Sequence, residues 1–214
     1  MSYPISVNLR DQLCLVVGGG KVAERKIKSL LTHGAQVRLV SPEATEMLQT
    51  LAAEGKIDWQ RETYTAGGTD ALDDVFLTIA CTDNRAVNAA VTREAQARQR
   101  LVLCADSPDA GNFVSLAQIS RGELSVTVST SGGSPTLAAV LRERLETEFG
   151  PEWAELTALI GRQRDQIKTI ASEAERKSAV RRVLDDAEVH ALLLGGRHLE
   201  AEARIRKCLF LSSE

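Results

Sequence analysis

The chain contains few cysteines and histidines, the residues that typically form disulfide scaffolds and metal sites. Its four cysteines are scattered, without the close pairs of a zinc site or the density of a disulfide scaffold. Its three histidines, His33, His190 and His198, stand at no metal-ligand spacing from one another or from a cysteine. We therefore expect no fixed metal site and interpret the histidines as surface or helix-end residues.

Long apolar runs are also missing. No segment approaches the roughly 20 apolar residues that span a bilayer, and residues 1–10 lack the basic and apolar stretches of a signal peptide. The formal charge of -3 leaves no basic excess for binding nucleic acid. We expect a cytoplasmic protein that binds neither membranes nor nucleic acid, with several buried and inert thiols.

Apolar runs and helical periods alternate through the first half of the chain. They predict, in order, strand 13–17, helix 21–33, strand 37–40, strand 75–80, helix 84–99 and strand 101–105. Strands that alternate with helices form parallel sheets covered on both faces. We expect an α/β fold with a Rossmann-like, doubly wound parallel sheet.

A turn-rich stretch, 107–112, marks a boundary after this sheet. Alternating residues beyond it predict a hairpin of strands 113–119 and 124–130 that turns at Arg121–Gly122. A helix should begin at Ser134–Pro135, because serine caps free N–H groups and proline suits the first helical position. It should end at Gly150–Pro151.

The remainder from Glu152 is helical in period, with a break at Gly195–Gly196. We therefore expect the sheet to be followed by a small α+β unit and a C-terminal helical domain. The predicted domains are a dinucleotide-binding Rossmann domain (1–112), a hairpin-plus-helix unit (113–150) and a helical domain (151–214).

The first predicted strand runs directly into a glycine-rich turn. Gly18, Gly19, Gly20 and the residues up to Ala23 match the G-x-G-x-x-G/A dinucleotide fingerprint between a buried strand and an amphipathic helix. Such glycines let the backbone approach a pyrophosphate, and the start of the helix favours its negative charge. A glycine-rich turn without a ligand is the alternative.

Two later strand ends offer further contacts for a dinucleotide. The second strand leads to Pro42 and Glu43, and Glu43 is the local acidic candidate for the ribose hydroxyls. Because no arginine stands there to neutralise a 2′-phosphate, NAD is favoured over NADP. Thr82 and Asp83 follow the next core strand, where they contact the nucleotide or where Asp83 only caps the following helix.

Several motifs together resemble one family, the bifunctional precorrin-2 dehydrogenase and sirohydrochlorin ferrochelatase, which also forms the N-terminal module of siroheme synthases. The resemblance covers essentially the whole chain. It is carried by Leu-Arg-Asp at 9–11, the run from Val17 to Lys26, Thr82-Asp83-Asn84 with Asn88, Asp106-Ser107-Pro108, and Ser129-Thr130 leading to Gly132-Gly133-Ser134-Pro135. The chain departs from the family at Leu103, usually asparagine, and at Leu116, commonly proline.

The resemblance implies an NAD-dependent oxidation of precorrin-2 to sirohydrochlorin, with insertion of Fe2+ as an optional second reaction. It implies NAD contacts at Lys21, Val22, Pro42 and Glu43, and a homodimer built on the 113–150 unit. It also implies that Asp106 is the catalytic residue. That position suits a general base, since desaturating the macrocycle releases a proton as hydride leaves. A turn cap before Pro108 is the alternative for Asp106.

The resemblance also places Ser129, Thr130 and Ser131 near the substrate. Hydroxyls before a helix start can bind carboxylate or phosphate, although a plain hydroxyl-rich loop explains them equally well. Basic residues of the C-terminal region could meet a polycarboxylate substrate, but acidic residues there balance them and favour solvated helix faces.

Two rival functions remain at this point. One is a regulatory NAD-binding module like the nucleotide-sensing domains of potassium-uptake systems, which the residues after 106 argue against. The other is a dehydrogenase for a small alcohol or acid. Its usual catalytic histidine or tyrosine–lysine pair has no clear counterpart here.

Overall fold

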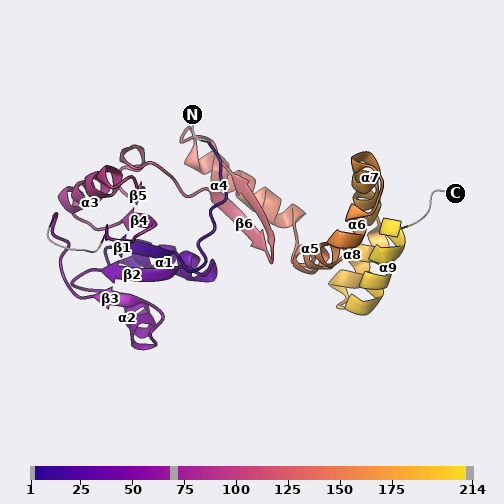
Figure 1. Cartoon of the computed structure of the whole chain (residues 1–214), viewed down its shortest axis with the longest axis horizontal. Helices are drawn as coiled ribbons and strands as arrows, with labels where there is room; N and C mark the ends of the chain where they lie inside the picture. Colours follow the sequence, from indigo (N-terminus) through magenta and orange to yellow (C-terminus); the bar gives the residue numbers. More distant parts are fainter. Residues whose placement is uncertain (1–2, 68–71, 211–214) are drawn as a thin grey trace. The chain divides into compact units, whose positions relative to one another are not determined.

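The structure is a computed structural model that describes residues 3–67 and 72–210. It divides into two compact units, residues 2–115 and residues 116–214. The sheet of the first unit has the order β3-β2-β1-β4-β5, and every pairing in it is parallel. Figure 1 shows this sheet with its helices. The parallel pairing and the strand order of this sheet confirm the predicted doubly wound α/β fold.

The elements of the first unit follow the predicted order closely. They are β1 (Leu13–Val17), α1 (Lys21–Thr32), β2 (Gln36–Val40), α2 (Glu46–Ala53), β3 (Asp58–Gln60), β4 (Leu77–Ala80), α3 (Arg85–Ala97), β5 (Leu101–Cys104) and the 3₁₀ turn η2 (Pro108–Ala110). Helix α2 and strand β3 were not predicted from the sequence. A helix of eight residues and a strand of three carry too short a pattern to recognise.

The sheet buries both of its faces. One face packs Val16 and Leu39 against Ala23 and Ile27 of α1, and Leu103 belongs to the same cluster. The other face packs Leu15 and Val17 against α3. Strands buried on both faces read as continuous apolar runs, which explains why β1 and β5 were recognisable in the sequence.

The second unit begins with an antiparallel hairpin. The elements of the second unit are β6 (Ala117–Arg121), β7 (Leu124–Val128), α4 (Pro135–Glu148), α5 (Glu152–Arg162), α6 (Arg164–Lys168), α7 (Glu173–Leu184), α8 (Ala187–Leu194) and α9 (His198–Phe210). Strands β6 and β7 form the hairpin. The Arg121 guanidinium donates to the carbonyls of Phe149 and Glu146 and so ties the hairpin to the end of α4. The helices from α5 onward bury a core of their own.

The predicted first strand of the hairpin, 113–119, was wrong in its placement. Asn112 donates its amide to Arg100 O and accepts from Val102 N, so this segment is bound to β5. Phe113 then packs on the core of the first unit. The strand begins only at Ala117. The proposed division of residues 113–214 at position 150 stays a prediction.

Candidate functional site

The glycine turn after β1 has the geometry of an anion-binding helix start. Gly18 has a positive φ of 112°, and a Cβ there would stand 2.6 Å from the carbonyl oxygen of Cys81. Gly20 is the N-cap of α1, and no side chain caps this helix. A Cβ on Gly20 would meet nothing within 4 Å. Free backbone N–H groups therefore border open space, as a pyrophosphate requires.

The loop after β2 packs directly on this turn. A Cβ on Gly19 would stand 1.9 Å from the carbonyl oxygen of Glu43, so only glycine permits this approach. The N–H of Thr45 donates to Gly19 O at 3.0 Å, and the Ser41 hydroxyl donates to Glu43 O at 2.7 Å. Pro42 and Glu43, both exposed, are thus held beside the glycine turn.

The first turn of α1 presents two of the predicted contact residues to solvent. Lys21 is exposed and pairs with Glu24 at 3.3 Å, and Val22 is 40% exposed. Ala23, at the third glycine position of the fingerprint, is fully buried. A small residue there lets α1 lie close to the sheet.

The loop after β4 lies against Gly18 from the other side. Thr82 N is one of the atoms nearest to the position of a Cβ on Gly18, at 3.0 Å. Asn84, not Asp83, caps α3, since its side chain accepts from the N–H groups of Ala86 and Val87. The alternative of a cap by Asp83 was therefore wrong, and Asp83 is exposed.

Asp106 follows β5 at the same edge of the sheet. Its Oδ1 accepts from Asn88 Nδ2 at 2.8 Å and from the Cys104 thiol at 3.2 Å. The Cys104 thiol, followed by the Asn88 amide and Arg85, lowers the pKa of Asp106, while partial burial opposes them. The side chain is 28% exposed. Ser107, not Asp106, is the N-cap residue of η2, and no side-chain hydrogen bond caps this turn. The Asp106 carboxylate is held by the Asn88 amide and the Cys104 thiol.

These features fit a dinucleotide at one edge of the sheet. The contacts run from Glu43 through Gly19 and Gly18 to Thr82, and onward through Asn88 to Asp106. Ligands of open α/β sheets bind at the carboxyl ends of the strands where the strand order reverses, here between β1 and β4.

Some residues at this edge were not singled out for a role in the sequence. Asn88 and Cys104 bind Asp106, so the buried Cys104 thiol is a hydrogen-bond donor at this edge. Arg61 follows β3, where its guanidinium stacks 4.2 Å from the Trp59 ring. The resemblance had already included Asn88, and a polar residue in the middle of an apolar helix face was the further signal that could have predicted its structural role.

The hydroxyl-rich loop belongs to the second unit. Thr130 Oγ1 donates to Ser134 O and accepts from Ser134 N, both at 3.1 Å. Ser129 Oγ accepts from Ser131 N at 3.2 Å, and Ser131 has a positive φ of 51°. Ser134 caps α4 as predicted. Two of these three hydroxyls thus hold the loop itself, and their contact with substrate stays a prediction.

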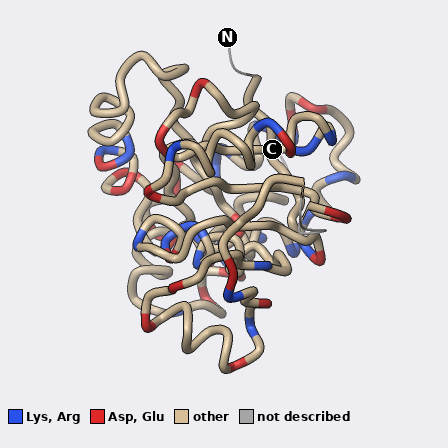
Figure 2. Tube along the Cα trace, turned by 90° about the vertical axis from the view of Figure 1, so that its left-hand side faces the viewer, with Lys and Arg blue, Asp and Glu red and all other residues tan. Residues whose placement is uncertain are grey.

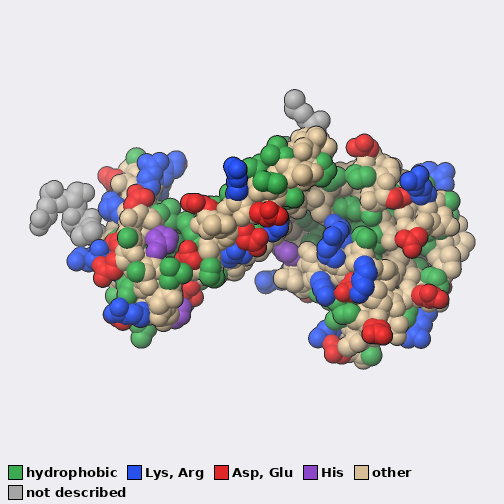
Figure 3. All heavy atoms as spheres, turned by 180° about the vertical axis from the view of Figure 1, so that it is seen from behind, with side chains coloured by type: hydrophobic (Ala, Val, Ile, Leu, Met, Phe, Trp, Pro, Cys, Tyr) green, Lys and Arg blue, Asp and Glu red, His purple; other side chains and the backbone are tan. Residues whose placement is uncertain are grey.

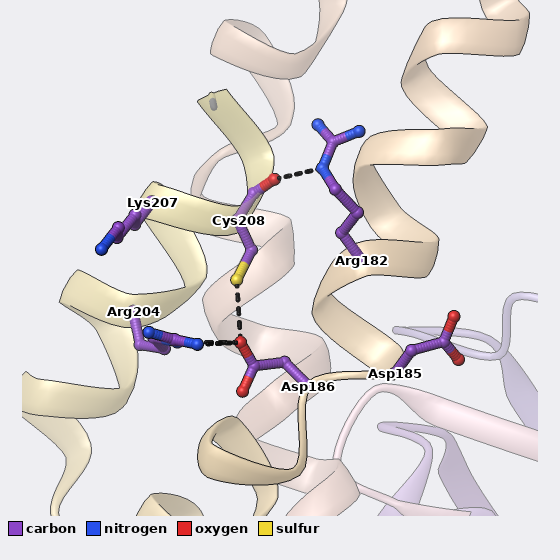
Figure 4. Close-up of a pocket in the computed structure, with 6 residues that line it drawn as sticks. All are labelled: Arg182, Asp185, Asp186, Arg204, Lys207 and Cys208. Atoms are coloured by element: carbon purple, nitrogen blue, oxygen red, sulfur yellow. Dashed lines mark hydrogen bonds and ion pairs between the residues drawn. The ribbon is translucent and has the colours of Figure 1, made fainter. Parts of the chain in front are cut away.

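A pocket of about 430 Å³ in the helical part has a structural explanation (Figure 4). Arg204 pairs with Asp186 at 2.7 Å and with Glu188 at 3.1 Å. Arg182 donates to the carbonyl of Cys208 near the end of α9, and the Cys208 thiol points to Asp186. The bonds of Arg182, Asp186 and Arg204 thus join α7, α8 and α9, so we do not place the chemistry in this pocket.

The described residues contain no cluster of side chains suited to a metal ion. No helix among them is long and apolar enough to cross a membrane. Two histidines bind carbonyls locally: His33 contacts Ser29 O at 2.7 Å and His190 contacts Leu184 O at 3.0 Å. Charges of both signs are mixed along the chain and over the visible surface, without a basic stripe (Figures 2 and 3).

Two protein-family models match the chain. The one described as "Putative NAD(P)-binding" matches residues 5–117, and the one described as "Sirohaem biosynthesis protein central" matches residues 121–148. The first match agrees with the NAD cofactor that the sequence predicted.

Curated relatives and a solved structure agree with these matches. A siroheme synthase of Xylella fastidiosa (strain M12) is 36% identical over 97% of this chain and 43% of that protein. Siroheme synthase 1 of Serratia proteamaculans (strain 568) is 40% identical over 78% of this chain and 35% of that protein. The chain thus spans less than half the length of these relatives. A structure described as "SirC, precorrin-2 dehydrogenase" aligns with a TM-score of 0.73 at 29% identity, covering 96% of this chain and 100% of that one.

Proposed function

This chain belongs to the NAD(P)-binding module family of siroheme biosynthesis, and from that premise we propose that it oxidises precorrin-2 to sirohydrochlorin with NAD. The observation that carries the proposal is a single sheet edge that joins an uncapped, glycine-lined helix start to a held carboxylate. The match to a precorrin-2 dehydrogenase along almost the whole chain supports the choice of substrate.

Under this proposal, different residues bind the cofactor and accept the proton. Gly18, Gly19 and Gly20, with the start of α1, bind the pyrophosphate, while Glu43 accepts from the ribose hydroxyls. Lys21, Val22, Pro42, Thr82 and Asp83 complete the cofactor contacts. When bound, the nicotinamide supplies the hydride acceptor. Asp106 accepts the proton that the macrocycle loses in the same oxidation.

The test mixes the purified chain, NAD and precorrin-2 and follows the absorbance of sirohydrochlorin and NADH. Asp106→Ala should lose at least about 100-fold in turnover, the usual contribution of a general base. Asp109→Ala, three residues further in the exposed turn η2, is the matched control and should keep full turnover. Unchanged turnover of the Asp106 variant would remove this residue from the reaction.

We propose insertion of Fe2+ into sirohydrochlorin as a second activity of the same carboxylate. The relatives are named siroheme synthase, and siroheme is the iron complex of this tetrapyrrole. Metal insertion requires the pyrrole N–H protons to leave, so it needs a base in the same place. Sirohydrochlorin and Fe2+ without NAD test this activity alone, and absence of siroheme would refute it.

We propose that the chain works as a homodimer through the hairpin and α4. The hairpin has two strands only, and α4 exposes Leu137 at 49% and Val140 at 44%. Exposed apolar side chains beside open strand edges are typical of an interface. Light scattering after gel filtration should give twice the chain mass. Leu137→Glu should give the monomer, and the control Leu194→Glu, on the exposed face of α8, should not.

A cytoplasmic location is part of the proposal. All four cysteines are free thiols in the structure, the state that a reducing compartment maintains. Fractionation of cells that produce the full-length protein tests this location.

A further inference from the structure

Asn88 is a buried polar side chain, and burying a polar group costs free energy unless its hydrogen bonds are made. It lies in α3 and is only 1% exposed. Its Oδ1 accepts from Thr82 N at 3.0 Å and from Thr82 Oγ1 at 2.8 Å. Its Nδ2 donates to Thr82 O at 2.9 Å and to Asp106 Oδ1 at 2.8 Å. The amide therefore uses both donors and both acceptor positions.

This set of partners fixes the direction of the amide. If the amide were turned over, its oxygen would face the Thr82 carbonyl and the Asp106 carboxylate, and its NH₂ group would face the N–H of Thr82. Both changes would place like groups together in a buried site. The donor that reaches Asp106 thus cannot rotate away without breaking three other bonds.

The two oxygens of Asp106 have different surroundings. Oδ1 receives the Asn88 amide and also the thiol of Cys104, which is 3% exposed. For Oδ2, the described part of the chain offers an ion pair with Arg85 Nε at 3.9 Å, and the Arg85 side chain is 91% exposed. One oxygen is thus held by two buried donors, while the other pairs with an exposed guanidinium in a carboxylate that is 28% exposed.

We propose that Asn88 and the Cys104 thiol are positioning residues that hold Oδ1 of Asp106, so that Oδ2 is the atom that receives the proton from the substrate. This rests on the proposed function, and it adds two residues and one atom to it. Neither residue contacts the reacting groups. Each acts through the carboxylate by fixing its plane and direction.

The same contacts lead to a measurable electrostatic effect. The charged or titratable groups that act on Asp106 are Cys104 from β5 and Arg85 from α3. Both Cys104 and Asn88 lower the pKa of Asp106. Burial and the neighbouring carboxylate raise the pKa of the Cys104 thiol, so it stays protonated and remains a donor. Removing either donor should raise the pKa of Asp106.

The test uses Cys104→Ala, Cys104→Ser and Asn88→Asp, with Cys14→Ala as the control for the loss of a fully buried thiol elsewhere in the sheet. ¹³C NMR of labelled aspartate follows the Asp106 carboxyl without substrate, and Asp106→Asn identifies its signal. Cys104→Ala should raise the pKa by about half to one unit, as for one lost hydrogen bond. Asn88→Asp should raise it further because two carboxylates then face each other. Cys104→Ser should restore the original value.

The acid limb of the pH profile for precorrin-2 oxidation should move by the same amounts, and turnover of Cys104→Ala should fall about 10-fold. The inference would be overturned if folded Cys104→Ala showed an unshifted Asp106 titration and an unshifted pH profile, both the same as in Cys14→Ala. If the unmodified chain does not oxidise precorrin-2, the proposed function fails, while the NMR titration still decides whether the two donors hold Oδ1. Should Asn88→Asp not fold, the two Cys104 variants decide alone.

Discussion

Neighbouring glycines in the turn after β1 should respond to the same substitution in opposite ways. In Gly20→Ala the new methyl group meets nothing within 4 Å, and Gly20 has a φ of -82° that alanine adopts freely. In Gly19→Ala the methyl group would stand 1.9 Å from Glu43 O. Backbone cannot give way as a side-chain end does, so the 41–45 loop must move by about 1 Å or more to reach ordinary contact.

The two variants should therefore separate folding from cofactor binding. Overpacking of this kind costs about 1–3 kcal/mol, so Gly19→Ala should melt several degrees lower, at about 2–4 °C per kcal/mol. Gly20→Ala should melt at or slightly above the original temperature, because alanine restricts the unfolded chain. Its methyl group, however, occupies the space where the pyrophosphate approaches, and NAD affinity should fall about 10- to 100-fold, or roughly 1.4–2.8 kcal/mol.

Thermal unfolding by circular dichroism and NAD titration by calorimetry measure the two effects separately. Gly20→Ala that binds NAD as tightly as the unmodified chain would refute the placement of the pyrophosphate at this turn. Gly19→Ala that melts unchanged would refute the close packing of the 41–45 loop.

Further predictions concern cofactor choice and the helical part. Glu43→Ala should weaken the preference for NAD over NADP in competition titrations, because it removes the carboxylate that would repel a 2′-phosphate. Asp186→Ala should destabilise the helical part by about 1–2 kcal/mol in urea unfolding, since it loses the cap of α8 and its ion pair with Arg204. Burial raises the pKa of Asp186, but Arg204, Cys208 and the N–H groups of α8 outweigh it and lower the pKa overall. The stabilisation by Asp186 should therefore be full above about pH 4 and fade as the pH falls below it, so unfolding curves of Asp186→Ala and the unmodified chain should converge in acid. Arg182→Met should cost about 1 kcal/mol, because the last carbonyls of α9 lose their donor.

Local pattern in the sequence was enough to predict the parallel sheet and the glycine turn. The continuous apolar run of β1, the three glycines and the amphipathic period of α1 are neighbours in the chain, so their structure depends on backbone preference and on which face is buried. The same reasoning placed α4 from Ser134 and Pro135. It misplaced the start of the hairpin because the bonds of Asn112 to β5 are not local.

The surroundings of Asp106 could be known only from the tertiary structure. In the parallel pairing of β4 and β5, Ala80 lies opposite Cys104. Thr82 and Asp106 each follow that pair by two residues, and this register brings them to the same place, where Asn88 binds both. Residue types and their order determined which groups the chain has for proton transfer and cofactor binding. Strand register and helix packing decided which oxygen is held and which is free, because hydrogen bonds between distant segments depend on where the folded sheet places them.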